Sequence, residues 1–181
     1  MKKTIIFVIL VSSFVFLTAC ASDDEIADEL IDYYNNEWIP IHAMKRSELG
    51  TAKEDFRKIM MESGEDHEKE AIELHENDII PVIDKVVDQF ESIELRHRKI
   101  KKLNKMQIKA EKHGRDLMQN GIDYFKGDAS KSKYIQKDNE LKRKYDEVNE
   151  YLEKLMDIYN LEYDRKKDSI EGYYELKRKE E

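Results

Sequence analysis

The chain contains few of the residues that crosslink a fold or interrupt regular structure. Cys20 is the single cysteine, so no disulfide can form within the chain, and the fold must be held by packing alone. With six glycines and two prolines, few positions require a helix to bend or end. No stretch alternates between apolar and polar residues for long enough to indicate a strand, so we expect no sheet.

Negative charge exceeds positive charge. The formal net charge is −8, from 32 basic and 40 acidic residues. A protein of this charge does not attract polyanions, so we expect no nucleic-acid partner. Charged residues make up 40% of the chain, and together with the scarcity of glycine and proline this composition is typical of long helices.

Motifs that carry catalysis are missing from the sequence. It has no glycine-rich phosphate loop, no nucleophile elbow and no HExxH spacing. The best candidate for a metal site is the acidic run from residue 67 to 78, but its histidines, His67 and His75, lie two helical turns apart, about 12 Å. That distance is too long for both to bind one ion, so the run is interpreted as a solvated helix start. We expect no enzyme activity, no metal site and no cofactor.

The most informative stretch is Leu17-Thr18-Ala19-Cys20. It resembles the lipobox of a bacterial lipoprotein signal peptide, in which an aliphatic residue and two small residues precede the modified cysteine. The preceding residues agree, because Lys2 and Lys3 supply a positive start and residues 4–17 form an apolar region. That region is too short to cross a hydrocarbon core of about 30 Å as a permanent helix.

The resemblance implies that residues 1–19 are a signal peptide and that Cys20 becomes the acylated N-terminus. Palmitate-type chains on Cys20 would then hold the protein to the extracytoplasmic face of the cell membrane, since two chains bind stably where one binds only marginally. The alternative is that Cys20 is an ordinary signal-peptide cysteine or a free thiol. The resemblance transfers no site residue other than Cys20.

Residues 20–181 are expected to form a single helical domain. Apolar residues three or four positions apart predict helices over about residues 23–61, 67–125 and 130–178. Ser22, followed by three acidic residues, is typical of a helix N-cap. Long helices joined by short turns fold back on one another, so we expect an all-α fold, an elongated antiparallel three-helix bundle or coiled coil.

Two prolines, Pro40 and Pro81, fall inside the predicted helices and must either kink or break them. Each lies in a similar segment, residues 36–41 and 77–82. This similarity indicates a duplicated unit, a chance match, or kinks placed at similar heights for packing.

Two further groups of side chains allow more than one interpretation. The basic segment, residues 96–112, either binds anionic wall polymers or lipid headgroups, or lies against the acidic faces of neighbouring helices. The aromatic residues are either core residues or the walls of a groove for a peptide or glycan. They are Tyr33, Tyr34, Trp38, Tyr151, Tyr159, Tyr163, Tyr173 and Tyr174.

The leader, the size and the lysine- and glutamate-rich helices together resemble the small helical cell-wall-binding lipoproteins of the YkyA type in Gram-positive bacteria. That resemblance implies a role between membrane and wall. We expect a lipid-anchored, non-catalytic protein that binds a cell-wall polymer or an envelope protein, with the membrane itself contacted through Cys20. The alternative is a toxin-immunity factor or an accessory subunit of a membrane complex. The sequence leaves the oligomeric state open.

Overall fold

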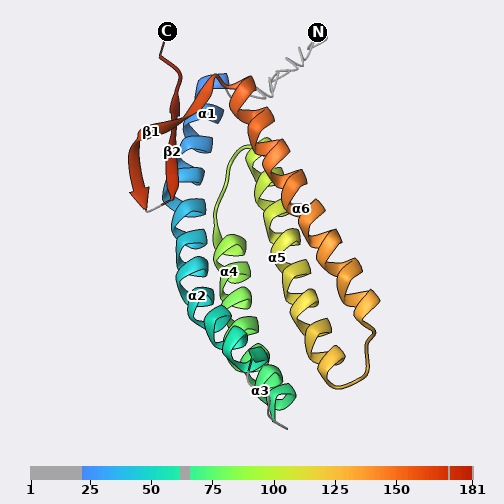
Figure 1. Ribbon diagram of the computed structural model, residues 1–181. Coiled ribbons are helices and arrows are strands. Elements are labelled where there is room, and N and C mark those ends of the chain that lie inside the picture. The colour runs from blue at the N-terminus through green and yellow to red at the C-terminus, as the bar shows by residue number, and fades with distance from the viewer. Residues whose placement is uncertain (1–21, 62–65, 171, 181) are drawn as a thin grey trace, which may run out of the picture.

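The computed structural model describes residues 22–61, 66–170 and 172–180, without the side chains of residues 166–169. The predicted signal peptide, Cys20 and most of the first predicted turn therefore lie outside the described residues. Figure 1 shows four antiparallel helical segments followed by a β-hairpin. The helices are α1 (Asp23–Asp32), α2 (Ile39–Met61), α3 (His67–Leu74), α4 (Ile80–Ser92), α5 (Arg98–Phe125) and α6 (Lys131–Ile158). Two π-helical turns, η1 (Tyr33–Trp38) and η2 (His75–Ile79), and two strands, β1 (Leu161–Ile170) and β2 (Tyr173–Arg178), complete the described elements.

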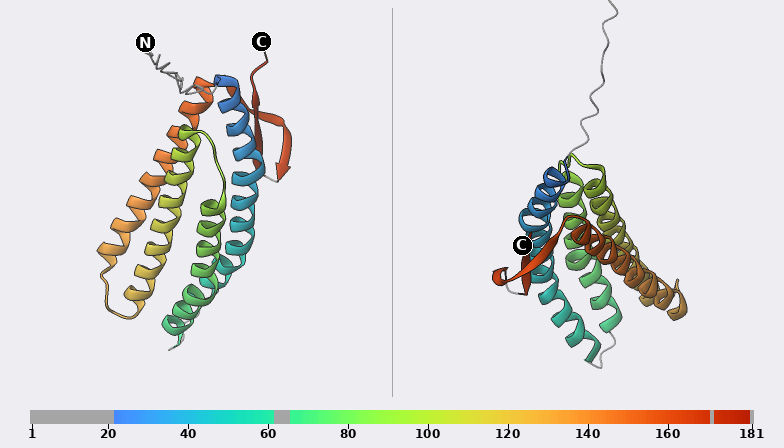
Figure 2. Two further views of the ribbon diagram at one scale, coloured as in Figure 1. Left: turned by 180° about the vertical axis from the view of Figure 1, so that it is seen from behind. Right: turned by 90° about the horizontal axis from the view of Figure 1, so that it is seen from above.

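The four segments form an elongated bundle. The first segment, α1–η1–α2, runs down the molecule, α3–η2–α4 returns, α5 descends and α6 returns again (Figure 1). In Figure 2, α5 and α6 lie as one pair beside the pair of α2 and α4. The hairpin folds back beside α1, so the first and last described residues lie at the same end. We call this the N-terminal end, and the end that carries the α2–α3 and α5–α6 connections the distal end.

The expectation of a mainly helical chain is confirmed, and the first predicted helix has the predicted bounds. The three-helix arrangement is not. The predicted helix over residues 67–125 ends at Ser92, and residues 93–97 cross to α5 in extended conformation. The physical reason is an alternation within the crossing: Ile93 and Leu95 are half-buried, whereas Glu94 and Arg96 are exposed. In the sequence, the apolar residues on both sides of this crossing keep a spacing close to that of a helix, so the pattern did not indicate that the helix ends at Ser92.

The predicted third helix over residues 130–178 is also too long. The helix ends at Ile158, and Asn160 adopts a left-handed backbone with φ of 55°, a conformation that asparagine tolerates and that stops a helix. The chain then forms the antiparallel pair β1–β2, so the expectation of no sheet was wrong. Leu161 and Leu176 are buried while Glu162 and Lys177 beside them are less so, a period of two that the density of charged residues obscured.

Neither proline breaks its helix. Before Pro40 the chain widens into η1, where the Ile39 N–H donates to the Tyr34 carbonyl five residues back, and before Pro81 the Ile80 N–H donates to the His75 carbonyl in the same way. A proline ring clashes with the carbonyl four residues earlier, and a π-turn relieves that clash by lengthening the loop of the hydrogen bond. The two similar segments thus share a local device that keeps both helices continuous.

The core runs along the axis where the four segments meet. Its buried side chains come from every helical segment and from both strands of the hairpin. The largest fully buried apolar ones are Tyr33, Phe90, Leu30, Ile39, Ile100, Leu103, Ile122, Leu155 and Leu161. Fully burying one such side chain contributes about 1.5–3 kcal/mol to the free energy of folding. Leu161 and Leu176 of the hairpin are both buried in this core, so apolar packing as well as polar contacts holds the hairpin against the bundle.

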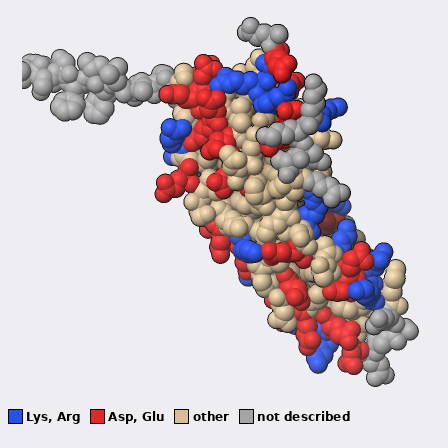
Figure 3. Space-filling model, turned by 90° about the vertical axis from the view of Figure 1, so that its left-hand side faces the viewer, with Lys and Arg blue, Asp and Glu red and all other residues tan. Residues whose placement is uncertain are grey.

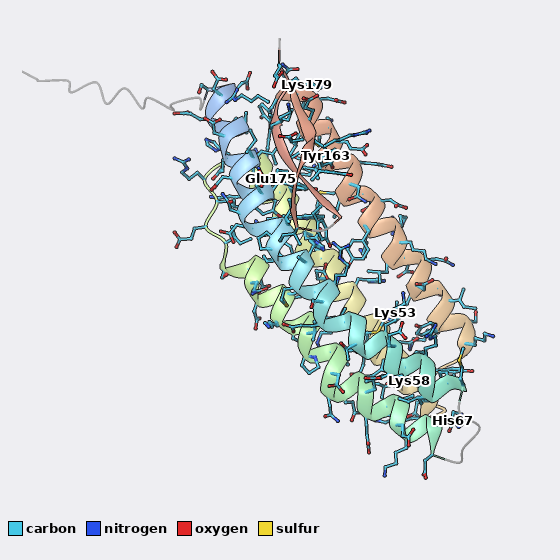
Figure 4. The ribbon with its side chains drawn as sticks, turned by 60° about the vertical axis from the view of Figure 1, so that its left-hand side comes forward. Lys53, Lys58, His67, Tyr163, Glu175 and Lys179 are labelled. Carbon is cyan, nitrogen blue, oxygen red and sulfur yellow. The ribbon has the colours of Figure 1, made fainter. Side chains whose placement is uncertain are left out.

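Asn35, in the π-turn η1, bonds the hairpin to the first segment. Its Nδ2 donates to the Leu176 carbonyl at 3.0 Å, and the Leu176 N–H donates to its Oδ1 at 2.7 Å. The side-chain amide therefore pairs with β2 as the backbone of a third strand would. Ring contacts of Tyr34 with Tyr163 (6.0 Å between centroids) and of Trp38 with Tyr173 (6.1 Å) flank this pair. Figure 4 labels Tyr163 and Glu175 in this region.

Replacing Asn35 by alanine should loosen the hairpin selectively. The change removes both bonds to Leu176 and should lower the free energy of unfolding by about 1–3 kcal/mol, with faster amide hydrogen exchange in β1 and β2 than in α5. Asn36→Ala is the matched control, because Asn36 bonds only the neighbouring Asp32 on an exposed surface and should change stability by about 0.5 kcal/mol or less. Equal effects of the two substitutions would contradict the role assigned to Asn35.

Candidate functional site at the N-terminal end of the bundle

The N-terminal end begins with a closed helix cap directly after the predicted lipidation residue. Ser22 Oγ accepts from the Glu25 N–H at 3.2 Å, and Glu25 Oε2 accepts from the Ser22 N–H at 3.1 Å. This reciprocal pair is a capping box, and it confirms the cap predicted at Ser22. Only one residue separates Ser22 from Cys20, so the helical body starts immediately beside the position of the predicted anchor.

Arg178, the last residue of β2, binds the first helix at this end. Its guanidinium donates to the Asp24 and Asp28 carboxylates, each at 2.7 Å, and to the Asp24 carbonyl at 3.0 Å. These side chains are exposed to solvent, where an ion pair contributes at most about 1 kcal/mol. Their main effect is geometric, since they join the two ends of the described chain.

A buried carboxylate organises the interior of the same end. Glu29 of α1 is 8% exposed, and its two oxygens accept from the backbone N–H of Arg96 at 2.5 Å and of His97 at 2.9 Å; the His97 ring also donates to it from Nδ1. The first turn of α5 has no cap from its own N-cap side chain. Glu29 therefore supplies from another helix the negative charge that a helix N-terminus favours.

The hydrogen bonds to Glu29 affect its pKa more than its burial does. Burial alone would raise the pKa of this carboxyl, but the backbone N–H groups of Arg96 and His97 and the His97 ring together hold the pKa below its ordinary value of 4.5. Glu29 is thus charged in the folded protein at neutral pH, and the negative charge is part of how the crossing from α4 to α5 is held.

Part of the basic segment predicted from the sequence contacts neighbouring elements, although the side chains concerned stay exposed to solvent. Lys99 donates to the Tyr159 hydroxyl at 2.7 Å, and Lys102 lies over the Tyr151 ring at 4.3 Å from its centroid. Farther along, Lys112 pairs with Glu91 of α4 at 2.6 Å. These contacts place three of its cations against neighbouring elements, and two of the three partners are tyrosines instead of carboxylates.

The aromatic residues divide between the core and the surface. Tyr33, Tyr34 and Tyr159 are at most 5% exposed, and burial raises the pKa of the Tyr33 and Tyr34 hydroxyls well above the ordinary range. Tyr174 is 44% exposed. Most of these rings therefore serve packing, and the structure does not collect them into one groove.

The two histidines of the acidic run at residues 67–78 lie on one helical segment in different surroundings. His67 starts α3 half-buried, whereas His75 is 5% exposed and its Nδ1 lies 2.7 Å from the Ala71 carbonyl oxygen. Over residues 22–61, 66–170 and 172–180, no three His, Cys, Asp or Glu side chains gather closely enough to hold a metal ion.

Sequence reasoning missed a polar cluster in the middle of the bundle. Glu111 of α5 is fully buried; its oxygens accept from Lys45 of α2 at 2.5 Å and from Gln107 at 2.8 Å, and Lys45 also donates to the Tyr145 hydroxyl of α6 at 2.9 Å. The signal was present: Gln107 and Glu111 fall on the apolar stripe of α5 between Leu103 and Leu117. A buried carboxylate and ammonium that satisfy each other specify how three helices align more than they add stability.

His42 lies next to this cluster and is neutral. Burial, together with the positive charge of Lys45, lowers its pKa from 6.5 to about 3. Its ring packs on Trp38, with centroids 3.9 Å apart, and on Phe90 at 5.6 Å. His42 therefore behaves as a core aromatic residue at physiological pH.

Comparison of the chain with models of known protein families, with curated proteins and with solved structures finds no match. Among the helices of the described residues, none is both long and apolar enough to cross a bilayer. Function has to be argued from the residues themselves.

Glu29→Gln tests the cap on α5. At pH 7 the variant should unfold about 2 kcal/mol more easily, because the neutral amide loses charge-assisted bonds and turns a donor toward an N–H group. Since the folded pKa of Glu29 is lowered, its stabilisation is complete above pH 4.5 and is lost as the pH falls through the folded pKa. Chemical unfolding of both proteins from pH 7 to 3 should therefore show the difference shrinking below pH 4.5.

The control for this measurement is Asp28→Asn, which removes an exposed partner of Arg178 and should cost less than about 1 kcal/mol. Protonation of His42 on acidification affects all of these proteins alike, so it cancels in the comparison. A difference between Glu29→Gln and the unchanged protein that persists undiminished at pH 3 would argue against a charged cap.

The buried pair is tested by a double-mutant cycle. Lys45→Met should lower the free energy of unfolding by about 3–5 kcal/mol, because it leaves the fully buried Glu111 carboxylate without its cation. Glu111→Leu should cost less, because the Lys45 side chain is 19% exposed and can reach water. The double variant should lose much less than the sum of the two. The exposed pair Lys142–Asp138, 2.6 Å long, provides the matched control, with expected coupling near 0.5 kcal/mol. Additive losses at Lys45 and Glu111 would exclude the pairing.

Proposed function

We propose that this protein is a lipoprotein of the outer face of a bacterial cell membrane, held there by acyl chains on Cys20. The observation that carries the proposal is the sequence Leu17-Thr18-Ala19-Cys20 behind a positively charged, apolar leader. Two acyl chains hold a protein stably to a bilayer without any contact from its surface. The described helices need supply no membrane contact under this proposal.

The geometry of the N-terminal end supports the anchoring role. The capping box at Ser22 starts α1 close behind Cys20, and Arg178 and Asn35 bond the hairpin to the same segment. An anchor at Cys20 would therefore attach to an ordered end of the bundle and not to a long tether. The 28 residues of α5 span about 42 Å at 1.5 Å per residue, so the distal end would stand about that far from the membrane surface.

We further propose that the protein acts by binding and not by catalysis, and that its partner is an envelope protein more than an anionic wall polymer. The buried Lys45–Glu111 pair is satisfied internally and needs no substrate to explain it. Three lysines of the basic segment contact neighbouring elements, and the net charge is −8, which disfavours a polyanion. In Figure 3, neutral residues fill the middle of the face shown, with acidic and basic residues mixed toward both ends, a surface suited to a protein partner.

Cys20→Ser tests the anchor in a Gram-positive host expressing the full chain. The unchanged protein should incorporate radioactive palmitate and sediment with membranes, whereas the variant should stay unlabelled and keep its leader, because only a thiol receives the lipid. Ser22→Ala is the control: it opens the capping box at a cost of about 1 kcal/mol but leaves Leu17–Cys20 intact, so it should label normally.

Labelling of Cys20→Ser would overturn the anchoring proposal, and so would release of an unmodified native protein into the medium. Crosslinking of the same intact cells separates the partner classes. A protein attached to the anchored form supports the binding proposal, and attachment of wall polymer alone contradicts the preference for a protein partner.

A further inference from the structure

At the distal end, side chains from four helical segments surround a hollow of about 250 Å³. Lys58 and His67, labelled in Figure 4, mark this end of the molecule. The hollow lies between α2, the start of η2, the last turns of α5 and the first turn of α6. Its lining includes Phe56, His75, Gly121, Phe125, Lys131 and Tyr134.

The walls are aromatic rings set edge to face. Phe56 and His75 have centroids 5.4 Å apart at 80°, and Phe125 stands 6.1 Å from His75 and 6.3 Å from Phe56. Rings in this arrangement present both faces and edges to a guest ring. The hollow is thus lined by rings that can contact an aromatic guest.

Gly121 leaves the deep part of the hollow open. A Cβ atom at this position would stand 3.4 Å from His75 Nε2 and 3.5 Å from Tyr134 Cε2, both ordinary contact distances. An alanine methyl group would therefore occupy the space in front of the imidazole at contact distance. The space therefore depends on this single glycine.

The deep wall carries one hydrogen-bond acceptor. The Ala71 carbonyl can only accept, so the nitrogen that lies 2.7 Å from it, His75 Nδ1, bears the proton. In the neutral ring the other nitrogen, Nε2, is then an acceptor. Within the part of the chain that the structure describes, no donor is bonded to Nε2, which faces the space left by Gly121.

The rim of the hollow is open to solvent and carries one lysine. Tyr124, at the rim, is 43% exposed, and Lys131 is exposed in the first turn of α6. None of the described acidic residues forms an ion pair with Lys131. A guest would meet apolar walls, an acceptor at depth and a cation at the mouth.

We propose that this hollow binds a phenol ring, with the hydroxyl donating to His75 Nε2 and an anionic substituent directed toward Lys131. An apolar cavity of about 150 Å³ is large enough for benzene, so the volume suits a single substituted ring. The ring belongs either to a free phenolic acid or to a tyrosine side chain of a peptide. The inference does not rest on acylation of Cys20.

The test uses the full chain, labelled with ¹⁵N in its backbone and histidine rings, and titrated in mild detergent with 4-hydroxyphenylacetate. Saturable shifts should appear at His75, Gly121 and Phe125 and not in the hairpin. Phenylacetate, which lacks the hydroxyl, should bind about tenfold more weakly, since one hydrogen bond is lost. A short peptide with a tyrosine at its end, titrated separately, distinguishes the two sources of the ring.

Two variants separate binding from folding. Gly121→Ala should keep or raise the melting temperature, because alanine favours a helix over glycine, yet reduce affinity at least tenfold by filling the hollow. Gly50→Ala in α2 is the matched control, since a Cβ there meets nothing within 4 Å, and it should bind as the unchanged protein does. In His75→Phe, 4-hydroxyphenylacetate and phenylacetate should bind equally.

The proposal is supported if either ring source gives saturable shifts that Gly121→Ala weakens and Gly50→Ala does not. It is overturned if neither source gives saturable shifts at millimolar concentration, or if the shifts survive in Gly121→Ala. Equal affinity for the two acetates in the unchanged protein would overturn the assigned role of Nε2. None of these results depends on palmitate labelling, so the anchoring proposal is judged separately.

Discussion

The architecture depends on one carboxylate placed at the start of another helix. Where α4 stops at Ser92 no glycine or proline forces it to stop, and the N-cap side chain of α5 does not cap its own helix. Glu29 accepts from the N–H groups of Arg96 and His97, the two residues just before α5, and so stabilises an extended crossing that the local sequence does not demand. With this contact the chain makes four antiparallel passes; without it, the apolar spacing of residues 67–125 is compatible with one long helix.

The features that sequence reasoning predicted correctly are those decided locally. The first segment, the N-cap at Ser22 and the turn after Phe125 follow from spacing and cap residues within a few positions of each other. The break at residues 93–97 and the hairpin were missed because each depends on residues far along the chain, Glu29 in one case and Asn35 in the other. Period-two alternation at Ile93–Leu95 and at Leu161–Tyr163 was visible but too short to outweigh the surrounding helical pattern.

The candidate sites follow the same division between features decided by neighbouring residues and features decided by tertiary packing. Cys20 and its leader are predicted from a contiguous motif, and the structure does not describe these residues. The aromatic hollow could not be predicted, because Phe56, His75 and Tyr134 come from three different segments and only tertiary packing brings them together. The buried Lys45–Glu111 pair was detectable as polar residues on an apolar stripe, although its partner across the bundle was not.

Bonding of the last strand to the first helix has a mechanical consequence. Arg178 joins Asp24 and Asp28, and Asn35 joins Leu176, so a pull applied between residue 22 and residue 180 is resisted first by these few contacts. The four helical segments carry little of this force, because residues 22 and 180 lie at the same end of the bundle. Under load the hairpin would detach as a small, reversible element and lengthen the molecule while the bundle behind it stays folded.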